Sequence, residues 1–366
     1  MRAGSAQRSL LFFSLFFHTE IGDMPHRTFI TFIWPSVLAM LLFIALPVVS
    51  VGIQSLHIQH EQIVQTVKNC GPFGCKEVEI VDTESTALLQ KEQPLGRFNG
   101  LGTYTNRNHL AFDEIATAWR AGGGIGSFIG ALLNLPFYKA LAFTLTYTFI
   151  VTPFVLLLGF FIALAVNRLP GMVKGPTIFV SLLPMIVTPL IGSLILFWMI
   201  DAKGVIGGTL QLVFDNPDLS LKASPTLTWI TLIVYGVWHS APFAFVVFYA
   251  GLQTVPKDTL ESAMIDGATR WQQVQHVTVP HLAPLVVFIT LIQLMDNFRV
   301  FEPIVGFNAE ANATSLSWII YNDLRGSDGT MLFSSAAATS MLTIIGVCIL
   351  LAPVVIRTWR DNRQRA

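Results

Sequence analysis

The sequence predicts an all-α polytopic membrane protein with six transmembrane helices, and three observations support this fold class. Hydrophobic residues make up 53% of the 366 residues and charged residues only 12%, about half of the ~25% found in soluble domains. The mean hydropathy is +0.61. Apolar runs long enough to cross a bilayer core of about 30 Å recur along the chain. The formal net charge of +0 provides no basic field for nucleic acid.

Six apolar windows predict the spans, because backbone polar groups in lipid must be paired within the segment itself. The prolines inside these windows predict kinks that neighbouring helices support, rather than helix ends. The windows cover residues 28–53, 140–166, 177–200, 227–251, 284–306 and 331–356.

Lys and Arg in the short connections predict the orientation, since these residues accumulate on the cytoplasmic side. The 167–176 connection contains Arg168 and Lys174 without an acidic residue, and the tail 357–366 contains four arginines. We therefore expect both termini and the 252–283 connection to be cytoplasmic. The long region 54–139 is then a periplasmic loop insertion, which is translocated whatever its charge.

The first 27 residues are expected to form a cytoplasmic or interfacial segment. Their apolar core with basic flanks resembles a signal peptide, but the core is short and no small-residue cleavage site follows. An interfacial helix and a biological start at Met24 are the other interpretations.

Two of the three cysteines, Cys70 and Cys75, lie in "NCGPFGCKE". The glycines and the proline between them permit the tight turn that a disulfide needs in an oxidising compartment. The alternative, a metal site, would need further ligands beside these two cysteines, and zinc is not expected. The possible disulfide Cys70–Cys75 is the prediction, and no metal ligands are predicted.

The segment "ESAMIDGATRWQQVQHVTVP" (261–280) is the most polar helix-patterned stretch of the chain. Apolar and small residues recur every three or four positions, and acidic and amide residues lie outside that stripe. Gly267 predicts a bend, and Pro280 is expected to end the second of two short helices. By spacing alone this is an ordinary connector between two spans.

This segment resembles the EAA loop of binding-protein-dependent ABC importer permeases of the MalF-like sugar type. Ser262 and Val279 replace the usual Ala and Leu. Three further stretches resemble other elements of these permeases: "RFNGLGTYTN" (97–106), "FRVFEPI" (298–304) and "NATSLSWIIY" (312–321), although "FNAEA" replaces an expected Gly-Gly-Pro. The matching loop positions are Glu261, Ala263, Asp266, Gly267, Ala268, Val277, Pro280 and Pro284.

The resemblance implies a MalF/MetI-like permease fold, with residues 140–356 as the core. It implies that the loop 252–283 carries a coupling helix that docks on a separate ATPase, with Glu261, Ala263, Asp266, Gly267, Ala268 and Pro280 at the contact. The implied partners are an ATP-binding cassette ATPase dimer, a second, MalG-like permease and a periplasmic sugar-binding protein. The sequence has no G-x-x-x-x-G-K-[ST], so Mg-ATP would be bound by the ATPase subunits and no cofactor is expected in this chain. The chain would be a transport subunit of the inner membrane and not itself an enzyme.

Ionisable and amide side chains inside the spans predict a substrate pathway, because such groups are costly in lipid and usually functional. Asp296 and Arg299, and Arg299 and Glu302, are spaced as i,i+3 ion pairs. A structural ion-pair network and a substrate-binding face remain alternatives here, as do a buried structural His239 and a functional one. The pathway candidates are Gln293, Asp296, Asn297, Arg299, Trp238 and His239.

Two other classes of protein are alternatives. An ion-coupled secondary transporter would use the charged fifth span, but the two halves show no internal repeat. An intramembrane enzyme would need Asp296 and His239 to meet in space, and spacing does not establish this.

Overall fold

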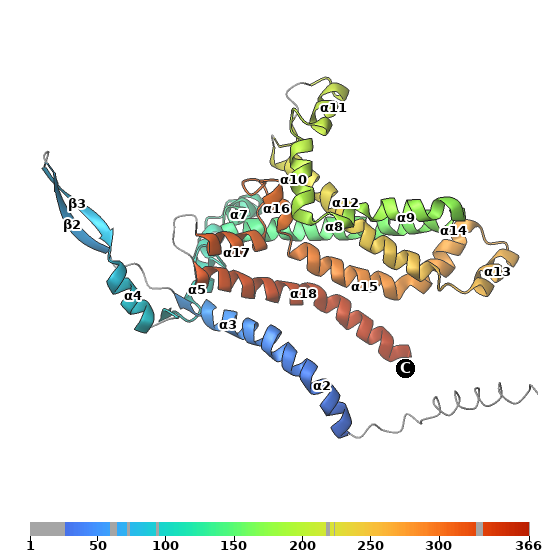
Figure 1. Ribbon diagram of the computed structural model, residues 1–366, viewed down its shortest axis with the longest axis horizontal. Helices are drawn as coiled ribbons and strands as arrows, with labels where there is room; N and C mark the ends of the chain where they lie inside the picture. Colours follow the sequence, from blue (N-terminus) through green and yellow to red (C-terminus); the bar gives the residue numbers. More distant parts are fainter. Residues whose placement is uncertain are drawn as a thin grey trace, which may run out of the picture. The chain divides into compact units, whose positions relative to one another are not determined.

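The computed structural model describes residues 26–58, 64–71, 74–92, 95–216, 220–222, 224–326 and 332–365. The chain divides into two compact units, Met1–Ile53 and Gln54–Ala366. The described part has five long apolar helices, and a bent helix pair brings the number of candidate spans to six (Figure 1). This agrees with the six windows expected from the sequence. The N-terminal segment 1–27 lies almost wholly outside the described residues.

The first span is one apolar helix, Ile30–Ser55, built from α2 (His26–Met40), a π-helical turn η1 (Leu41–Ala45) and α3 (Leu46–Ser55). The π turn directly precedes Pro47, and Leu46 N–H bonds to the Leu41 carbonyl. Proline lacks the N–H that the helical ladder needs. Widening the helix by one residue just before the proline lets the helix continue.

The region after this span begins with two small antiparallel sheets. β1 (His57–Ile58) pairs with β4 (Arg97–Phe98), β2 (Val64–Gly71) pairs with β3 (Gly74–Val81), and α4 (Thr83–Glu92) lies between β3 and β4. The β2–β3 register places Cys70 opposite Cys75. Directly opposed residues lie about 4.5–5.5 Å apart at Cα, which suits a disulfide. Their side chains lie outside the described part, so the bond stays a prediction.

Three short helices lead into the second span: α5 (Gly102–Thr105), α6 (Phe112–Arg120) and α7 (Gly124–Leu133). Before α6, the buried His109 places Nε2 3.2 Å from the Ser335 carbonyl and 3.1 Å from Thr339 Oγ1. Ser335 Oγ donates to Asp323 at 2.6 Å. Burial lowers the pKa of His109 and raises the pKa of Asp323. These contacts attach the loop to the start of the last span.

The core is formed by α8 (Pro136–Asn167), α12 (Pro225–Leu252) and α15 (Val279–Phe298). α8 and α12 pack side by side (Figure 1). Gly159 allows this approach, because a Cβ there would lie 2.6 Å from that of Ala244. Phe143, Phe245 and Ile289 are fully buried between these helices. α18 (Phe333–Arg365) packs on α15 and on α17 (Leu316–Arg325).

The third window, 177–200, is not one straight helix, which corrects the expectation of a simple span. α9 (Gly171–Ile186) and α10 (Pro189–Met199) meet at 93°, and α11 (Val205–Val213) follows. Pro189 restricts Thr188 to extended backbone, and Thr188 has φ −62° and ψ 145°. Here a proline ends the helix rather than kinking it.

The fifth span also differs from its window, 284–306. One helix runs from Arg270 to Phe298 through α14 (Arg270–Gln273), the π turn η2 (Val274–Thr278) and α15. The expectation that Pro280 ends a separate helix is therefore wrong. As before Pro47, a π turn precedes the proline, and Val279 N–H bonds to the Val274 carbonyl. The chain leaves the helix after Phe298 and forms α16 (Glu302–Gly306).

Candidate functional site

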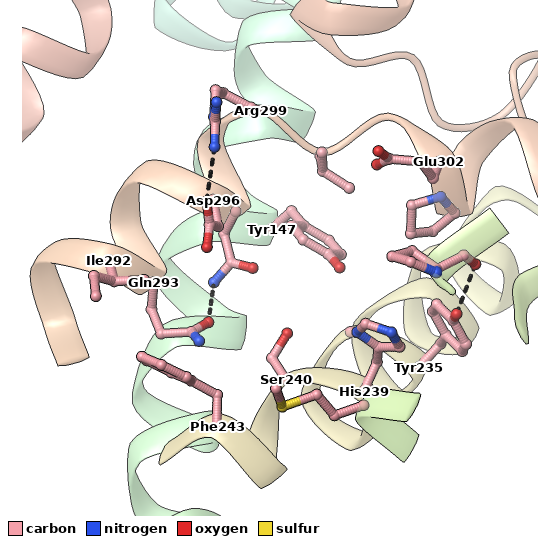
Figure 2. Close-up of a pocket in the computed structure, with 16 residues that line it drawn as sticks. Tyr147, Tyr235, His239, Ser240, Phe243, Ile292, Gln293, Asp296, Arg299 and Glu302 are labelled. Carbon is pink, nitrogen blue, oxygen red and sulfur yellow. Dashed lines mark hydrogen bonds and ion pairs between the residues drawn. The ribbon is translucent and has the colours of Figure 1, made fainter. Parts of the chain in front are cut away.

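A hollow of about 520 Å³ lies between α8, α12, α15, α16 and the α9–α10 break (Figure 2). We call it the central hollow. Five of the six predicted pathway residues line it: His239, Gln293, Asp296, Asn297 and Arg299. Trp238 is not among the lining residues, and its side chain is exposed. The structure thus brings together residues of two predicted spans but leaves Trp238 outside.

Gln293 and Asn297 form the buried polar wall of the central hollow, with 4% and 5% of their surface exposed. Asn297 Nδ2 donates to Thr152 Oγ1 of α8 at 3.1 Å and to Gln293 Oε1 at 3.4 Å. The spacing of four residues places both amides on one face of α15. Asn297 thereby links α15 to α8, while the Gln293 amide nitrogen stays available to the hollow.

Tyr235 and His239 of α12 hold the broken third span. The Tyr235 hydroxyl donates to the Pro189 carbonyl at 2.7 Å, and His239 Nε2 lies 3.1 Å from the Val187 carbonyl. A carbonyl only accepts, so Nε2 carries the proton. The end of a helix leaves its last carbonyls without helical partners, and His239 supplies such a hydrogen bond to Val187, the C-cap of α9, while Tyr235 ties the start of α10 to α12. His239 thus has a structural partner and also lines the hollow.

Charged groups occupy one side of the central hollow. Arg299 Nη2 lies 2.8 Å from Asp296 Oδ1 and confirms the first predicted i,i+3 pair. The second predicted pair, Arg299–Glu302, is not formed in the described part of the chain, because Glu302 stands on the separate helix α16. Both members of the formed pair are about half exposed, 51% for Asp296 and 57% for Arg299. The hollow therefore presents both charge signs to solvent.

Sequence reasoning missed Tyr147, Tyr235 and Ser240. The hydroxyls of Tyr147 and Ser240 point into the central hollow (Figure 2). A signal for Tyr147 was present, since Thr144, Thr148 and Thr152 recur every four residues and mark a polar stripe along α8. Within the described residues, no group of three or more His, Cys, Asp or Glu side chains is arranged to hold a metal ion.

The 252–283 loop contains a short helix followed by a sharp turn. α13 (Lys257–Ile265) ends with Asp266 as its C-cap and Gly267 in the left-handed region at φ +78°. Ala268 N–H bonds to the Ala263 carbonyl and Gly267 N–H to that of Met264, which is the Schellman pattern. This confirms the bend expected at Gly267. Thr269 then caps α14 in a capping box with Gln272.

The loop exposes both carboxylates and apolar side chains. Glu261, Asp266 and Gly267 are exposed, while Ala263 and Ala268 are half-buried. Ile265 is 86% exposed, and Met264 and Trp271 are also exposed. The predicted continuous apolar stripe is therefore broken by the turn at Gly267. The EAA-type positions from Glu261 to Ala268 lie together, whereas Pro280 lies in the first turn of α15.

Comparisons with known proteins agree with this architecture. Residues 122–365 match the family described as "Binding-protein-dependent transport system inner membrane component". The trehalose/maltose transport system permease protein MalF of Thermococcus litoralis is 26% identical over 227 residues, which is 61% of this chain and 75% of that protein. The trehalose transport system permease protein SugA of Mycobacterium tuberculosis is 29% identical over 204 residues, 55% of this chain and 64% of SugA.

A chain in the crystal structure of a bacterial ABC transporter involved in the import of the acidic polysaccharide alginate has the same fold. The TM-score is 0.60 at 19% identity, covering 91% of this chain and 98% of that chain. The family match covers two thirds of the sequence and includes the candidate spans from α8 onward, the central hollow and the 252–283 loop. This chain belongs to the family of inner membrane components of binding-protein-dependent transport systems, the permeases of ABC importers.

Proposed function

We propose that this chain forms one half of the pore of an ATP-driven importer that moves a carbohydrate across the cytoplasmic membrane. The observation that carries the proposal is the pairing of two features in one permease: a polar central hollow between the spans and an exposed helix–turn–helix loop outside them. Membership of the permease family favours this function over an ion-coupled carrier.

The chemistry of the central hollow suits a sugar. Its lining offers amide groups (Gln293), hydroxyls (Tyr147, Ser240) and carboxylates (Asp296, Glu302) to substrate hydroxyls. Aromatic rings beside such groups are typical of sites that orient a small molecule by a few polar contacts. The relatives named for trehalose and maltose support the same substrate class. Gln293, Asp296, Asn297, Arg299 and His239 are the proposed pathway residues.

The 252–283 loop is proposed to transmit ATP hydrolysis to the spans. α13 ends in a hydrogen-bonded turn, and α14 continues without interruption into the fifth span. A push on α13 is therefore carried directly into the helix that bears Gln293 and Asn297, since a short rigid helix moves as a unit. Glu261 and Asp266 would pair with Arg or Lys of an ATPase subunit.

The proposed assembly contains a second, MalG-like permease, two ATP-binding cassette subunits and a periplasmic sugar-binding protein. Mg-ATP would be bound by the ATPase subunits. In this arrangement both termini and the loop face the cytoplasm, and residues 54–139 face the periplasm. The basic 167–176 connection and tail 357–366 support this orientation.

The decisive experiment measures ATP hydrolysis by the assembled transporter in proteoliposomes with and without loaded binding protein. The double variant Glu261→Ala/Gly267→Pro should abolish the substrate-stimulated part of the hydrolysis while the chain still inserts into the membrane. Thr259→Ala is the matched control, because Thr259 is exposed on the opposite side of α13 and should leave stimulation unchanged. Normal coupling in the double variant would remove the loop from the mechanism.

A further inference from the structure

Helices α6 and α7 form a hairpin that the transport mechanism above does not use. α6 contacts α7, and α7 contacts the start of α8. We infer that the α6–α7 hairpin is a membrane-surface anchor whose apolar side lies in the lipid leaflet at the N-terminal end of α8. Its ligand is the lipid bilayer itself.

α6 is strongly amphipathic. Phe112, Ile115, Ala116 and Trp119 recur at spacings of three and four and so share one side of the helix. The side chains of Phe112 and Trp119 are exposed, the latter by 70%. Asp113, Thr117 and Arg120 lie on the opposite side. A short helix with one aromatic side and one charged side is the pattern of a helix that lies in the membrane interface.

α7 contains no charged residue at all. Its bulky residues gather on one side, and Ile125 there is 77% exposed, with Ile129 and Leu133 also exposed. Apolar helices of this kind are unstable in contact with water and need an apolar partner. Trp119 and Phe128 meet edge to face at 5.3 Å, so the aromatic side of α6 is joined to the bulky side of α7.

The position of α7 in the chain supports lipid as that partner. Only Asn134 and Leu135 separate α7 from α8, which begins at Pro136 and is long and apolar enough to cross the membrane. The end of α7 is therefore held near the lipid boundary. A helix of 10 residues measures about 15 Å, half of the ~30 Å hydrocarbon core, so α7 dips into one leaflet and does not cross.

The charges of the hairpin indicate whether it binds lipid through headgroup charge or through apolar side chains. Residues 112–133 contain two acidic residues, Asp113 and Glu114, and one basic residue, Arg120. This excess of one negative charge gives no attraction to anionic headgroups, which depends on clusters of Lys and Arg. Burial of apolar side chains is then the driving force, and the anchor works equally well in zwitterionic lipid.

Site-specific fluorescence tests the anchor in the full-length chain, reconstituted with its transporter subunits into phosphatidylcholine vesicles. Cys348, which is free and exposed, is replaced by Ser. An NBD label is then attached to Ile125→Cys or Ile129→Cys, with Asp113→Cys as the control on the polar side of α6. The parent protein without an added cysteine measures background labelling.

At Ile125→Cys and Ile129→Cys we expect blue-shifted emission and quenching by shallow spin-labelled lipid at least ~3-fold stronger than at Asp113→Cys, as for an interfacially buried face. Quenching by aqueous iodide should show the reverse order. Adding phosphatidylglycerol should change neither result. Equal iodide quenching at all three positions would overturn the inference. Protection from both quenchers would also overturn it, because the face would then be covered by another protein chain.

Discussion

The central hollow and the 252–283 loop satisfy their polar groups in opposite ways. In the hollow, Asn297 bonds to Thr152, and Tyr235 bonds to the backbone of the broken third span. In the loop, Glu261 and Asp266 are exposed, and Ile265 projects an apolar side chain into solvent. The buried polar groups of the hollow find their hydrogen-bond partners within this chain. The loop instead exposes carboxylates and apolar side chains together, as expected of a surface that binds another protein. Substitutions of the buried residues of the hollow should therefore affect stability, and those in the loop should affect coupling alone.

The largest effect is expected from Ile265→Asp in the loop. The substitution should change the free energy of unfolding of the chain only slightly, because Ile265 is already exposed and surface changes usually alter stability by less than about 0.5 kcal/mol. At an interface, loss of an apolar anchor costs about 2 kcal/mol or more, or roughly 30-fold. We expect uptake in proteoliposomes to fall by at least about 10-fold on this basis, with unchanged thermal unfolding.

Two results would contradict this prediction. Normal uptake would show that Ile265 faces no partner. A large loss of thermal stability would show that it packs within this chain. Thr259→Asp places the same charge on the opposite side of α13 and serves as the control, with uptake expected to remain near that of the unchanged protein.

Asn297→Ala in the central hollow should show the reverse profile. The substitution removes the donor to Thr152 and to Gln293 in a buried site, and such a loss costs about 1–3 kcal/mol. Thermal unfolding should move to lower temperature, and uptake should weaken while the subunits still assemble. Thr290→Val on the same helix is the control, because within the described part of the chain Thr290 Oγ1 bonds to the Val286 carbonyl one turn earlier and to no other element.

If Asn297→Ala transports normally, Asn297 has no place in the pathway. If the variant transports poorly but unfolds like the unchanged protein, the hydrogen bond to Thr152 contributes nothing to stability. The claim that the buried residues of the hollow stabilise the fold would then be wrong.

The two regions also differ in how many of their functional residues can be predicted from the sequence. The loop was recognisable because its bend, its small residues and its carboxylates follow one another along the chain. The residues of α15 were found because charges and amides stand out in an apolar run. Tyr147 and Ser240 were missed, because their convergence on the hollow depends on how α8 and α12 pack against each other.

The effect of a proline on its helix also depends on packing that the sequence does not show. Pro47 and Pro280 continue their helices through π turns, whereas Pro189 ends one at a 93° bend. All three lie in helix-patterned sequence. The difference at Pro189 lies in its surroundings, since side chains of α12 supply hydrogen bonds to carbonyls at the break. The hydropathy of a window does not reveal these hydrogen bonds, so the sequence predicted a kink at Pro189 instead of a break.

A smaller effect is expected for His109, a buried polar residue outside the hollow, and it concerns the pH dependence of stability. Burial lowers the pKa of His109 below its usual value of 6.5. The unfolded chain then binds the proton more readily than the folded one. The stability that the neutral ring contributes is fully present above pH 6.5 and falls as the pH drops from 6.5 toward the lower folded pKa.

His109→Gln should flatten this pH dependence, because glutamine does not titrate. Thermal unfolding of both proteins between about pH 7.5 and about pH 5, roughly one unit above and one and a half units below the ordinary histidine pKa, measures the difference. Asp323 lies close enough to favour the charged ring, and burial raises the pKa of Asp323, so the titration of Asp323 contributes to the pH dependence of both proteins. An equal loss of stability in both proteins would assign the acid sensitivity to other groups.

The smallest change in stability is expected for the exposed pair in the hollow. Asp296 and Arg299 form a 2.8 Å ion pair, but both side chains are about half exposed, and such pairs contribute only about 0–1 kcal/mol. Arg299→Gln should therefore unfold within about 1 kcal/mol of the unchanged protein. Its effect on transport should appear as a higher substrate concentration at half-maximal uptake, because the guanidinium lines the hollow. A stability loss as large as that of Asn297→Ala would show that Arg299 stabilises the fold as much as the buried amides do. The distinction between the buried amide side and the exposed charged side of the hollow would then be wrong.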